Sequence, residues 1–319
     1  MARLTIGARS SPLAMWQANH VRAALEAAWG GLRIEMKVIA TSGDRTAPRD
    51  AQAVAERGIF TKEIELALLA GKIDLAVHSL KDLPTRIADG LRLAAVPERE
   101  DPADALVAKD DLRLEDLPEG AKVLCGSPRR AAQLLARRRD LTILPVRGNV
   151  GARIRRLDNS DAAATVLACA GLVRLGLAGR ITQRLDPEDF VPAAGQGALG
   201  IEVRSDDGRT LELLKPLDHR PSHEAVAAER AFLASLGGGC RMPTGAYART
   251  SGDGKELVLS GLAARPDGAL PLKRTLSATV SDIDAAEELG RRLARQLLAE
   301  GAEEILREVA RFDRPLGSH

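Results

Sequence analysis

Strand-like and helix-like stretches alternate in two successive sets along this chain, and this alternation constrains the fold more than any other feature. The first set runs from RLTIGA (3–8) to LRLAAVPE (91–98), and the second from AKVLCGS (121–127) to AGLVRLGL (170–177). Such alternation is typical of parallel sheets covered by helices. From about Pro216 the pattern changes to a helix, three strand-like stretches and a long amphipathic helix, which predicts a small C-terminal α+β domain.

Composition narrows the class of protein. The chain has 319 residues, of which 45% are hydrophobic and 28% charged, as in ordinary globular proteins. A net charge of +2 and an aromatic content of 2% argue against a nucleic-acid partner, which would call for a basic excess and stacking rings. We find no signal peptide and no run of about 20 apolar residues. The three cysteines lie far apart in the sequence. These features predict a cytoplasmic protein without a membrane partner or a disulfide framework.

Basic residues recur where the predicted strands end. In open α/β sheets, ligands bind beyond the carboxyl ends of strands, where helix N-termini also favour anions. Any single basic residue there is better explained as solvated surface. The whole set favours an anion cleft on both halves of the chain, and it comprises Arg9, Lys81, Arg129, Arg130, Arg147, Arg153 and Arg174. Ser127 and the proline after it have the pattern of a helix start.

Two short segments indicate chemistry. VHSLKDLPT (77–85) places Asp82 after a strand and before a proline, where a carboxylate can stabilise a developing positive charge. In LGGGCRMPTGAY (236–247), three glycines precede Cys240, so a bulky group can approach that thiol. GQGALG (195–200) matches the dinucleotide-binding motif G-x-G-x-x-G, which must open a helix. Here the segment leads into a strand, so we reject a nucleotide cofactor. The five histidines do not cluster with the cysteines, and we predict no metal site.

Eight segments in order resemble the hydroxymethylbilane synthase family, also called the porphobilinogen deaminases. They are IGARSSPLAMWQA, HSLKDLPT, EREDPADALV, SPRR, VRGNVGARIRRLD, LACAGLVRLGL, PAAGQGALGIE and LGGGCRMPTGAY. The resemblance implies two α/β lobes similar to those of periplasmic binding proteins, with a double crossover, and a small C-terminal α+β domain. The implied domains are 1–96 with 194–215, 97–193, and 216–319, the last of which carries the cysteine.

The resemblance also implies a reaction. Members of the family carry a dipyrromethane cofactor in thioether linkage to a cysteine, which here is Cys240. Four porphobilinogens are added head to tail, each losing ammonia, and hydrolysis releases hydroxymethylbilane for tetrapyrrole biosynthesis. The implied partner is therefore the small molecule porphobilinogen, and the family expectation is a monomer. Each added unit brings an acetate and a propionate, which would explain the many arginines.

Site residues follow from the resemblance position by position. Asp82 is the implied catalytic carboxylate, which would bind pyrrole N–H groups and stabilise the cationic azafulvene formed as ammonia leaves. The implied cofactor and substrate ligands are Lys81, Arg129, Arg130, Arg147, Arg153 and Arg174, with Arg9, Ser11, Gln17, Ser79 and Ser127 lining the same cleft. Phe60 would pack against a pyrrole ring, although a plain core aromatic explains it as well. Residues 43–58 are interpreted as a mobile lid.

The chain departs from the family pattern before the arginine pair. Cys125 and Gly126 stand where the family commonly has hydroxyl residues, so hydrogen bonds from these two positions are not assumed. Two alternatives stay open at this point. One is a two-lobed protein that binds a small anion without catalysis, and it would need neither Cys240 nor Asp82. The other is a degenerate homologue that keeps the cofactor but does not turn over.

Overall fold

The computed structural model describes residues 3–42, 61–237, 242–269 and 271–312. Contacts within the chain divide it into two compact units. The first consists of Met1–Asp101, Val173–Gly176 and Gly195–His223, and the second of Pro102–Leu172, Leu177–Ala194 and Glu224–His319. No helix in the described ranges combines the length and the apolar character that spanning a membrane requires.

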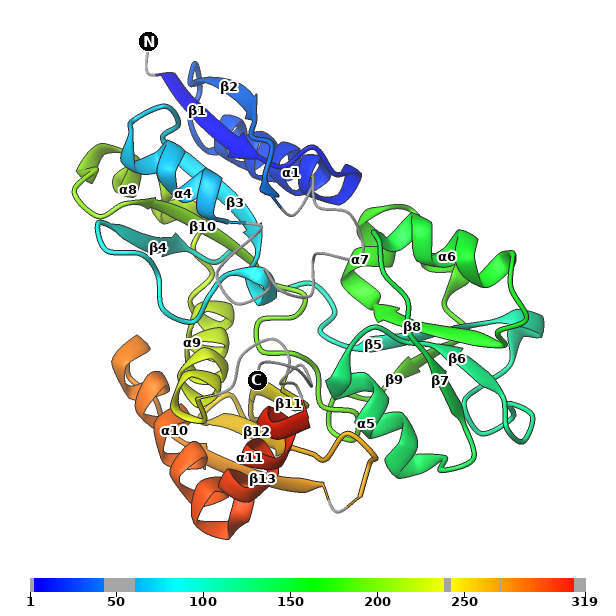
Figure 1. Cartoon of the computed structure of the whole chain (residues 1–319). Coiled ribbons are helices and arrows are strands. Elements are labelled where there is room, and N and C mark those ends of the chain that lie inside the picture. Colours follow the sequence, from blue (N-terminus) through cyan, green and yellow to red (C-terminus); the bar gives the residue numbers. More distant parts are fainter. Residues whose placement is uncertain (1–2, 43–60, 238–241, 270, 313–319) are drawn as a thin grey trace, which may run out of the picture. The chain divides into compact units, whose positions relative to one another are not determined.

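A five-stranded sheet forms the centre of the first unit (Figure 1). Its strands in spatial order are β2 (Arg33–Val38), β1 (Arg3–Ala8), β3 (Leu75–Ser79), β10 (Leu199–Arg204) and β4 (Leu91–Ala95). The first three are parallel, whereas β10 is antiparallel to both β3 and β4. The helical elements are α1 (Pro12–Ala28), α4 (Lys62–Leu69), η1 (Leu80–Asp82), α8 (Gly208–Leu214) and η4 (Lys215–Leu217). Leu4, Ile6 and Leu75 pack with α1 in one core cluster, and Ile64 and Leu68 of α4 belong to another.

The second unit contains a sheet with the same plan. Its strands in spatial order are β7 (Thr142–Leu144), β6 (Lys122–Leu124), β8 (Ala164–Ala168), β5 (Asp104–Ala108) and β9 (Gln183–Leu185). Again three strands are parallel, and the fourth, β5, is antiparallel to both of its neighbours. The accompanying helices are η2 (Lys109–Asp111), α5 (Pro128–Arg137), α6 (Val150–Asp158), α7 (Cys169–Arg174) and η3 (Ala178–Arg180), and the last two residues of α7 belong to the first unit.

The C-terminal part of the second unit is an antiparallel sheet of three strands packed against helices (Figure 1). The strands are β11 (Thr244–Thr250), β12 (Leu257–Ala263) and β13 (Leu272–Ala278), and the helices are α9 (Arg220–Ser235), α10 (Ile283–Leu297), the π-helical turn η5 (Leu298–Ala302) and α11 (Glu303–Phe312). Phe232 is fully buried in this core. A Cβ atom on Gly290 would lie 2.2 Å from the carbonyl oxygen of Ala228, so α10 and α9 pack closely only because position 290 is glycine.

The predicted α/β fold class with a C-terminal α+β part is confirmed. The parallel sheets that the alternation predicted are in fact mixed, because β10 and β5 run antiparallel to their neighbours. β5 follows the connection that leads from the first sheet to the second, and β10 follows the connection that leads back to the first. The sequence analysis also did not predict β5, β9 or α11. The three domain boundaries stay a prediction.

Candidate functional site

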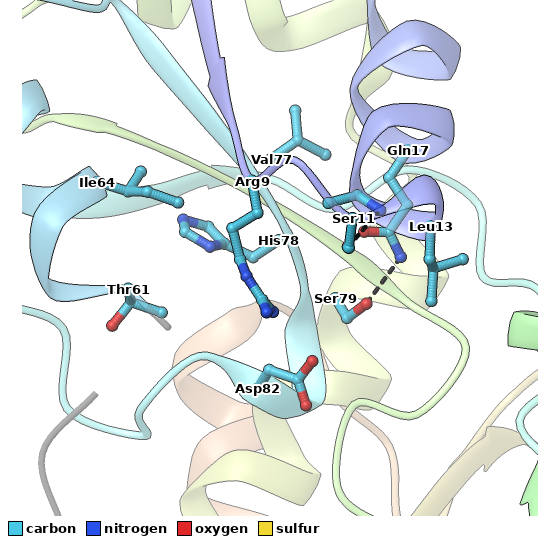
Figure 2. Close-up of a pocket in the computed structure, with 11 residues that line it drawn as sticks. Arg9, Ser11, Leu13, Gln17, Thr61, Ile64, Val77, His78, Ser79 and Asp82 are labelled. Carbon is cyan, nitrogen blue, oxygen red and sulfur yellow. Dashed lines mark hydrogen bonds between the residues drawn. The ribbon is translucent and has the colours of Figure 1, made fainter. Parts of the chain in front are cut away.

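Five of the predicted site residues line one cavity in the first unit. The cavity encloses about 430 Å³ of empty space, part of it open to solvent. Its lining includes Arg9, Ser11, Gln17, Ser79 and Asp82, which come from two separate segments of the sequence (Figure 2). Because β1 and β3 are parallel neighbours, their carboxyl ends meet at one edge of the sheet and bring these segments together.

The start of helix α1 forms one wall of the cavity. Ser11 is the N-cap, and its Oγ accepts a hydrogen bond from the Ala14 backbone N–H at 3.3 Å, with Pro12 at the first helical position. One turn further, the buried Gln17 donates from Nε2 to Ser79 Oγ at 2.7 Å (Figure 2). This bond ties α1 to the end of β3 and fixes the orientation of a hydroxyl in the wall.

Asp82 is an exposed carboxylate on a firmly anchored turn. It ends η1, whose first residue, Leu80, is 1% exposed. The Leu80 backbone N–H donates to the Ala198 carbonyl at 3.0 Å, and the Leu83 N–H closes the turn on the Leu80 carbonyl at 3.1 Å. Figure 2 shows the Arg9 side chain extending toward Asp82. The backbone therefore holds the Asp82 carboxylate at the cavity, on the side toward which the Arg9 guanidinium extends.

Lys81 and Arg174 contact the loop that precedes β10. Lys81 Nζ donates to the buried Gln196 side chain at 3.2 Å, and Arg174 Nη2 donates to the Gly197 carbonyl at 2.6 Å. The Arg174 guanidinium also lies 5.6 Å from the centre of the Trp16 ring, in a cation–π contact. Burial lowers the pKa of Arg174, which as a guanidinium still keeps its proton.

The second unit buries the predicted arginine pair around one carboxylate. Ser127 caps α5, accepting from the Arg130 N–H at 3.4 Å. Arg129 Nη1 lies 2.7 Å from Asp104 Oδ2, and Arg130 Nε lies 2.8 Å from Asp104 Oδ1. Asp104 is 0% exposed, and the arginines 4% and 6%. Burial lowers the pKa of Arg129, although Asp104 opposes that effect. The triad, Arg129–Asp104–Arg130, carries one excess positive charge.

The other two predicted arginines of this unit are more accessible. Arg147 is exposed and Arg153 half-buried. Arg153 Nε donates to the Gly148 carbonyl at 2.8 Å, just before α6 and its N-cap, Asn149. Gly148 has a φ of 107°, a left-handed conformation that favours glycine. Arg153 is thereby held close to a helix N-terminus, where anions are favoured.

The remaining predictions concern Cys240, Phe60, residues 43–58 and the thiol of Cys125. Cys240, Phe60 and the predicted lid at 43–58 lie outside the described residues. Cys125, which replaces a hydroxyl of the family pattern, is buried, and its Sγ contacts the Ser127 carbonyl at 3.4 Å. Burial raises the pKa of the Cys125 thiol above its usual value, which disfavours the reactive thiolate.

Sequence reasoning missed two residues of these sites. Asp104 is in the quoted segment EREDPADALV but was not recognised as the partner of the arginine pair. His78 precedes Ser79 in the quoted segment HSLKDLPT and lines the cavity. Both residues could have been found from their positions, because Asp104 begins a strand within a quoted motif and His78 lies near the end of a strand beside the predicted site residue Ser79.

The fold and the cavity define an α/β protein that presents a carboxylate, hydroxyls and a cation beyond the ends of its strands. Two family models match the chain. "Porphobilinogen deaminase, dipyromethane cofactor binding domain" matches residues 4–212, and "Porphobilinogen deaminase, C-terminal domain" matches residues 223–299. The chain therefore belongs to the porphobilinogen deaminase family.

Curated relatives agree over nearly the whole length. A porphobilinogen deaminase of Chromobacterium violaceum is 46% identical over 309 residues, covering 97% of this chain and 98% of the relative. One of Syntrophobacter fumaroxidans is 44% identical over 308 residues, with the same coverage. A periplasmic binding protein of Salmonella typhimurium with high arginine specificity is only distantly similar, with 15% identity, a TM-score of 0.40, and 68% of this chain and 92% of the other covered. The predicted family, transferase class and dipyrromethane cofactor are confirmed, and non-catalytic anion binding is not supported.

Proposed function

We propose that this chain joins four porphobilinogens head to tail on a dipyrromethane primer attached to Cys240, and then releases hydroxymethylbilane by hydrolysis. The observation that carries the proposal is the convergence of Arg9, Ser11, Ser79 and Asp82 on one cavity. The family supplies the reaction class, and the cavity supplies groups of the right chemistry. We also propose that the protein acts as a monomer in the cytoplasm.

The residues around the cavity fit the cofactor and the substrate chemically. Both molecules carry carboxylates, for which a guanidinium and two hydroxyls are suitable donors. Both also carry pyrrole N–H groups, and Asp82 offers a carboxylate to accept them. The bound dipyrromethane would supply the primer from which the chain grows. Arg9, Ser11 and Ser79 would hold carboxylates, and Asp82 would face ring nitrogens.

Asp82 would act by charge. When ammonia leaves porphobilinogen, the C–N bond electrons depart with nitrogen and the remaining ring becomes cationic. A fixed carboxylate nearby lowers the energy of that cation, because its position is set by the anchored η1 turn before the reaction begins.

The arginines of the second unit would bind the carboxylates of the cofactor and the growing chain. The buried triad has an excess positive charge but little exposed surface, so it would act on a carboxylate at the surface above it. Arg147 and Arg153 are more accessible and would contact carboxylates directly.

Intact-protein mass spectrometry tests the attachment at Cys240. The purified chain should exceed its sequence mass by one dipyrromethane, and Cys240→Ser should lack the adduct. Cys125→Ser and Cys169→Ser are matched controls at two buried thiols, and both should keep it. A wild-type protein at bare sequence mass that gains no adduct when incubated with porphobilinogen would contradict the proposal.

A further inference from the structure

A buried histidine–carboxylate pair lies in the wall of the cavity that contains Asp82. His78 Nε2 lies 3.1 Å from Glu202 Oε2. The side chains of His78 and Glu202 are 5% and 0% exposed. His78 also lines the cavity, and Figure 2 shows its ring beside Arg9, on the side of Ile64. The function proposed above gives this pair no role.

The sheet places the two side chains together. His78 lies on β3 opposite Gly200 of β10, and Glu202 is two residues further along β10, so both residues are on the same face. This juxtaposition joins segments 124 residues apart. A carboxylate with no exposed surface is costly unless it is paired, and Glu202 Oε1 has no hydrogen-bond partner among the described residues. Such a cost at a cavity wall is typical of a functional site and not of packing alone.

The pairing sets the orientation of the imidazole. With Nε2 directed at Glu202, a neutral ring donates its proton there, and Nδ1 is left with a lone pair. Among the described residues, Glu202 is the one hydrogen-bond partner that the structure gives the His78 imidazole. This is the arrangement of a general base held by a carboxylate.

Charged side chains lie on or next to the elements around His78. Glu202 is on β10, Arg9 follows β1, and Asp82 ends η1. Helix α4 contributes Ile64 to the cavity lining, and its Glu63 accepts from the Ser42 backbone N–H at 2.8 Å. Arg9, His78 and Asp82 are the titratable groups among the described lining residues. Of these side-chain types, imidazole is the one that most often acts as a general base.

The chemistry needs two different groups. Each addition forms a C–C bond between a ring carbon of the chain and the methylene carbon left by ammonia. The C–H bond of the attacked ring carbon then breaks, its electrons restore the aromatic ring, and a proton must be accepted. If Asp82 accepted that proton, it would lose the charge that stabilises the cation. A second group can accept it while Asp82 stays ionised.

We propose that His78 Nδ1 accepts the proton released by the attacked pyrrole carbon, and that Glu202 is the positioning residue that orients the ring. The proton then passes to the departed ammonia or to water, which returns His78 to its neutral form. This inference rests on the proposed function and adds a proton acceptor to it.

A kinetic isotope effect tests this role. His78→Gln should lower kcat by about 10²-fold or more, the usual contribution of a general base, with a smaller change in KM. With porphobilinogen deuterated at its free α-carbon, additions after the first must break a C–D bond. The variant should therefore show a primary isotope effect on kcat of about 2 or larger, while wild type shows a smaller one. Glu202→Gln should also lower kcat and raise the isotope effect, and both changes should be smaller than in His78→Gln.

The chain offers a matched control in His223, whose Nδ1 lies 2.8 Å from Asp218 Oδ1 and which does not line the cavity. His223→Gln should leave kcat and the isotope effect as in wild type. Added imidazole should restore part of the activity of His78→Gly, which a purely structural role does not allow. The inference is overturned if His78→Gln keeps wild-type kcat, or if kcat falls with an unchanged isotope effect and no rescue. Inactive wild type would instead contradict the proposed function.

Discussion

At the scale of single residues, the role proposed for Asp82 predicts a loss of catalysis without a loss of the attached cofactor. It is an exposed carboxylate on a turn that the Leu80 and Leu83 backbone hydrogen bonds hold in place. Asp82→Asn keeps the shape and a hydrogen-bond acceptor but removes the charge. We expect kcat to fall about 10²- to 10³-fold, equivalent to roughly 2.7–4 kcal/mol of barrier. Porphobilinogen consumption measures this, and the intact mass should still show the dipyrromethane adduct.

The matched control for this prediction is Asp89→Asn. Asp89 is an exposed aspartate that does not line the cavity, and its loss should leave turnover unchanged. Wild-type turnover in Asp82→Asn would remove Asp82 from the role proposed for it.

At the scale of elements, Asp104 joins strand β5 to helix α5. Its two oxygens bind Arg129 and Arg130, whose guanidiniums also donate to the Val191 and Val166 carbonyls. Asp104→Asn removes the negative charge that the two buried guanidiniums share, so we expect the free energy of unfolding to fall by about 3–5 kcal/mol. Urea unfolding measures it. Asp116→Asn, at an exposed position, should change stability by less than about 0.5 kcal/mol. An Asp104→Asn protein as stable as wild type would contradict the buried triad.

The elements also show how far the sequence could be interpreted. Strand β1 and helices α1 and α5 could be predicted nearly to the residue, because apolar periodicity, Ser11, Ser127 and the prolines after these serines mark their limits. The antiparallel direction of β5 and β10 could not, since it depends on pairing with strands far away in the sequence. The same holds for Asp104 and Glu202, whose partners are chosen by packing and not by local pattern.

At the scale of the whole molecule, the proposed function requires the arginines to bind a chain that gains two carboxylates with each unit. Arg147→Ala should slow chain growth, because a charge-assisted hydrogen bond contributes about 1.5–3 kcal/mol, or roughly 10- to 100-fold in affinity. Because Arg147 is exposed, we expect the lower end of that range. Intact-mass measurements during turnover should show partly extended chains accumulating. Arg139→Ala removes an exposed arginine elsewhere and should give the wild-type distribution.

The sequence motifs identified the family and five of the cavity residues. That these five residues lie around one cavity could not be predicted in this way, because it depends on the parallel pairing of β1 and β3.

The most direct test of the account is a crystal structure of the enzyme purified with its cofactor attached. We predict pyrrole nitrogens at about 2.7–3.2 Å from the Asp82 carboxylate, with carboxylates of the rings contacting Arg9, Ser11 or Ser79. Pyrrole rings bound away from this cavity, with Asp82 facing only solvent, would contradict it.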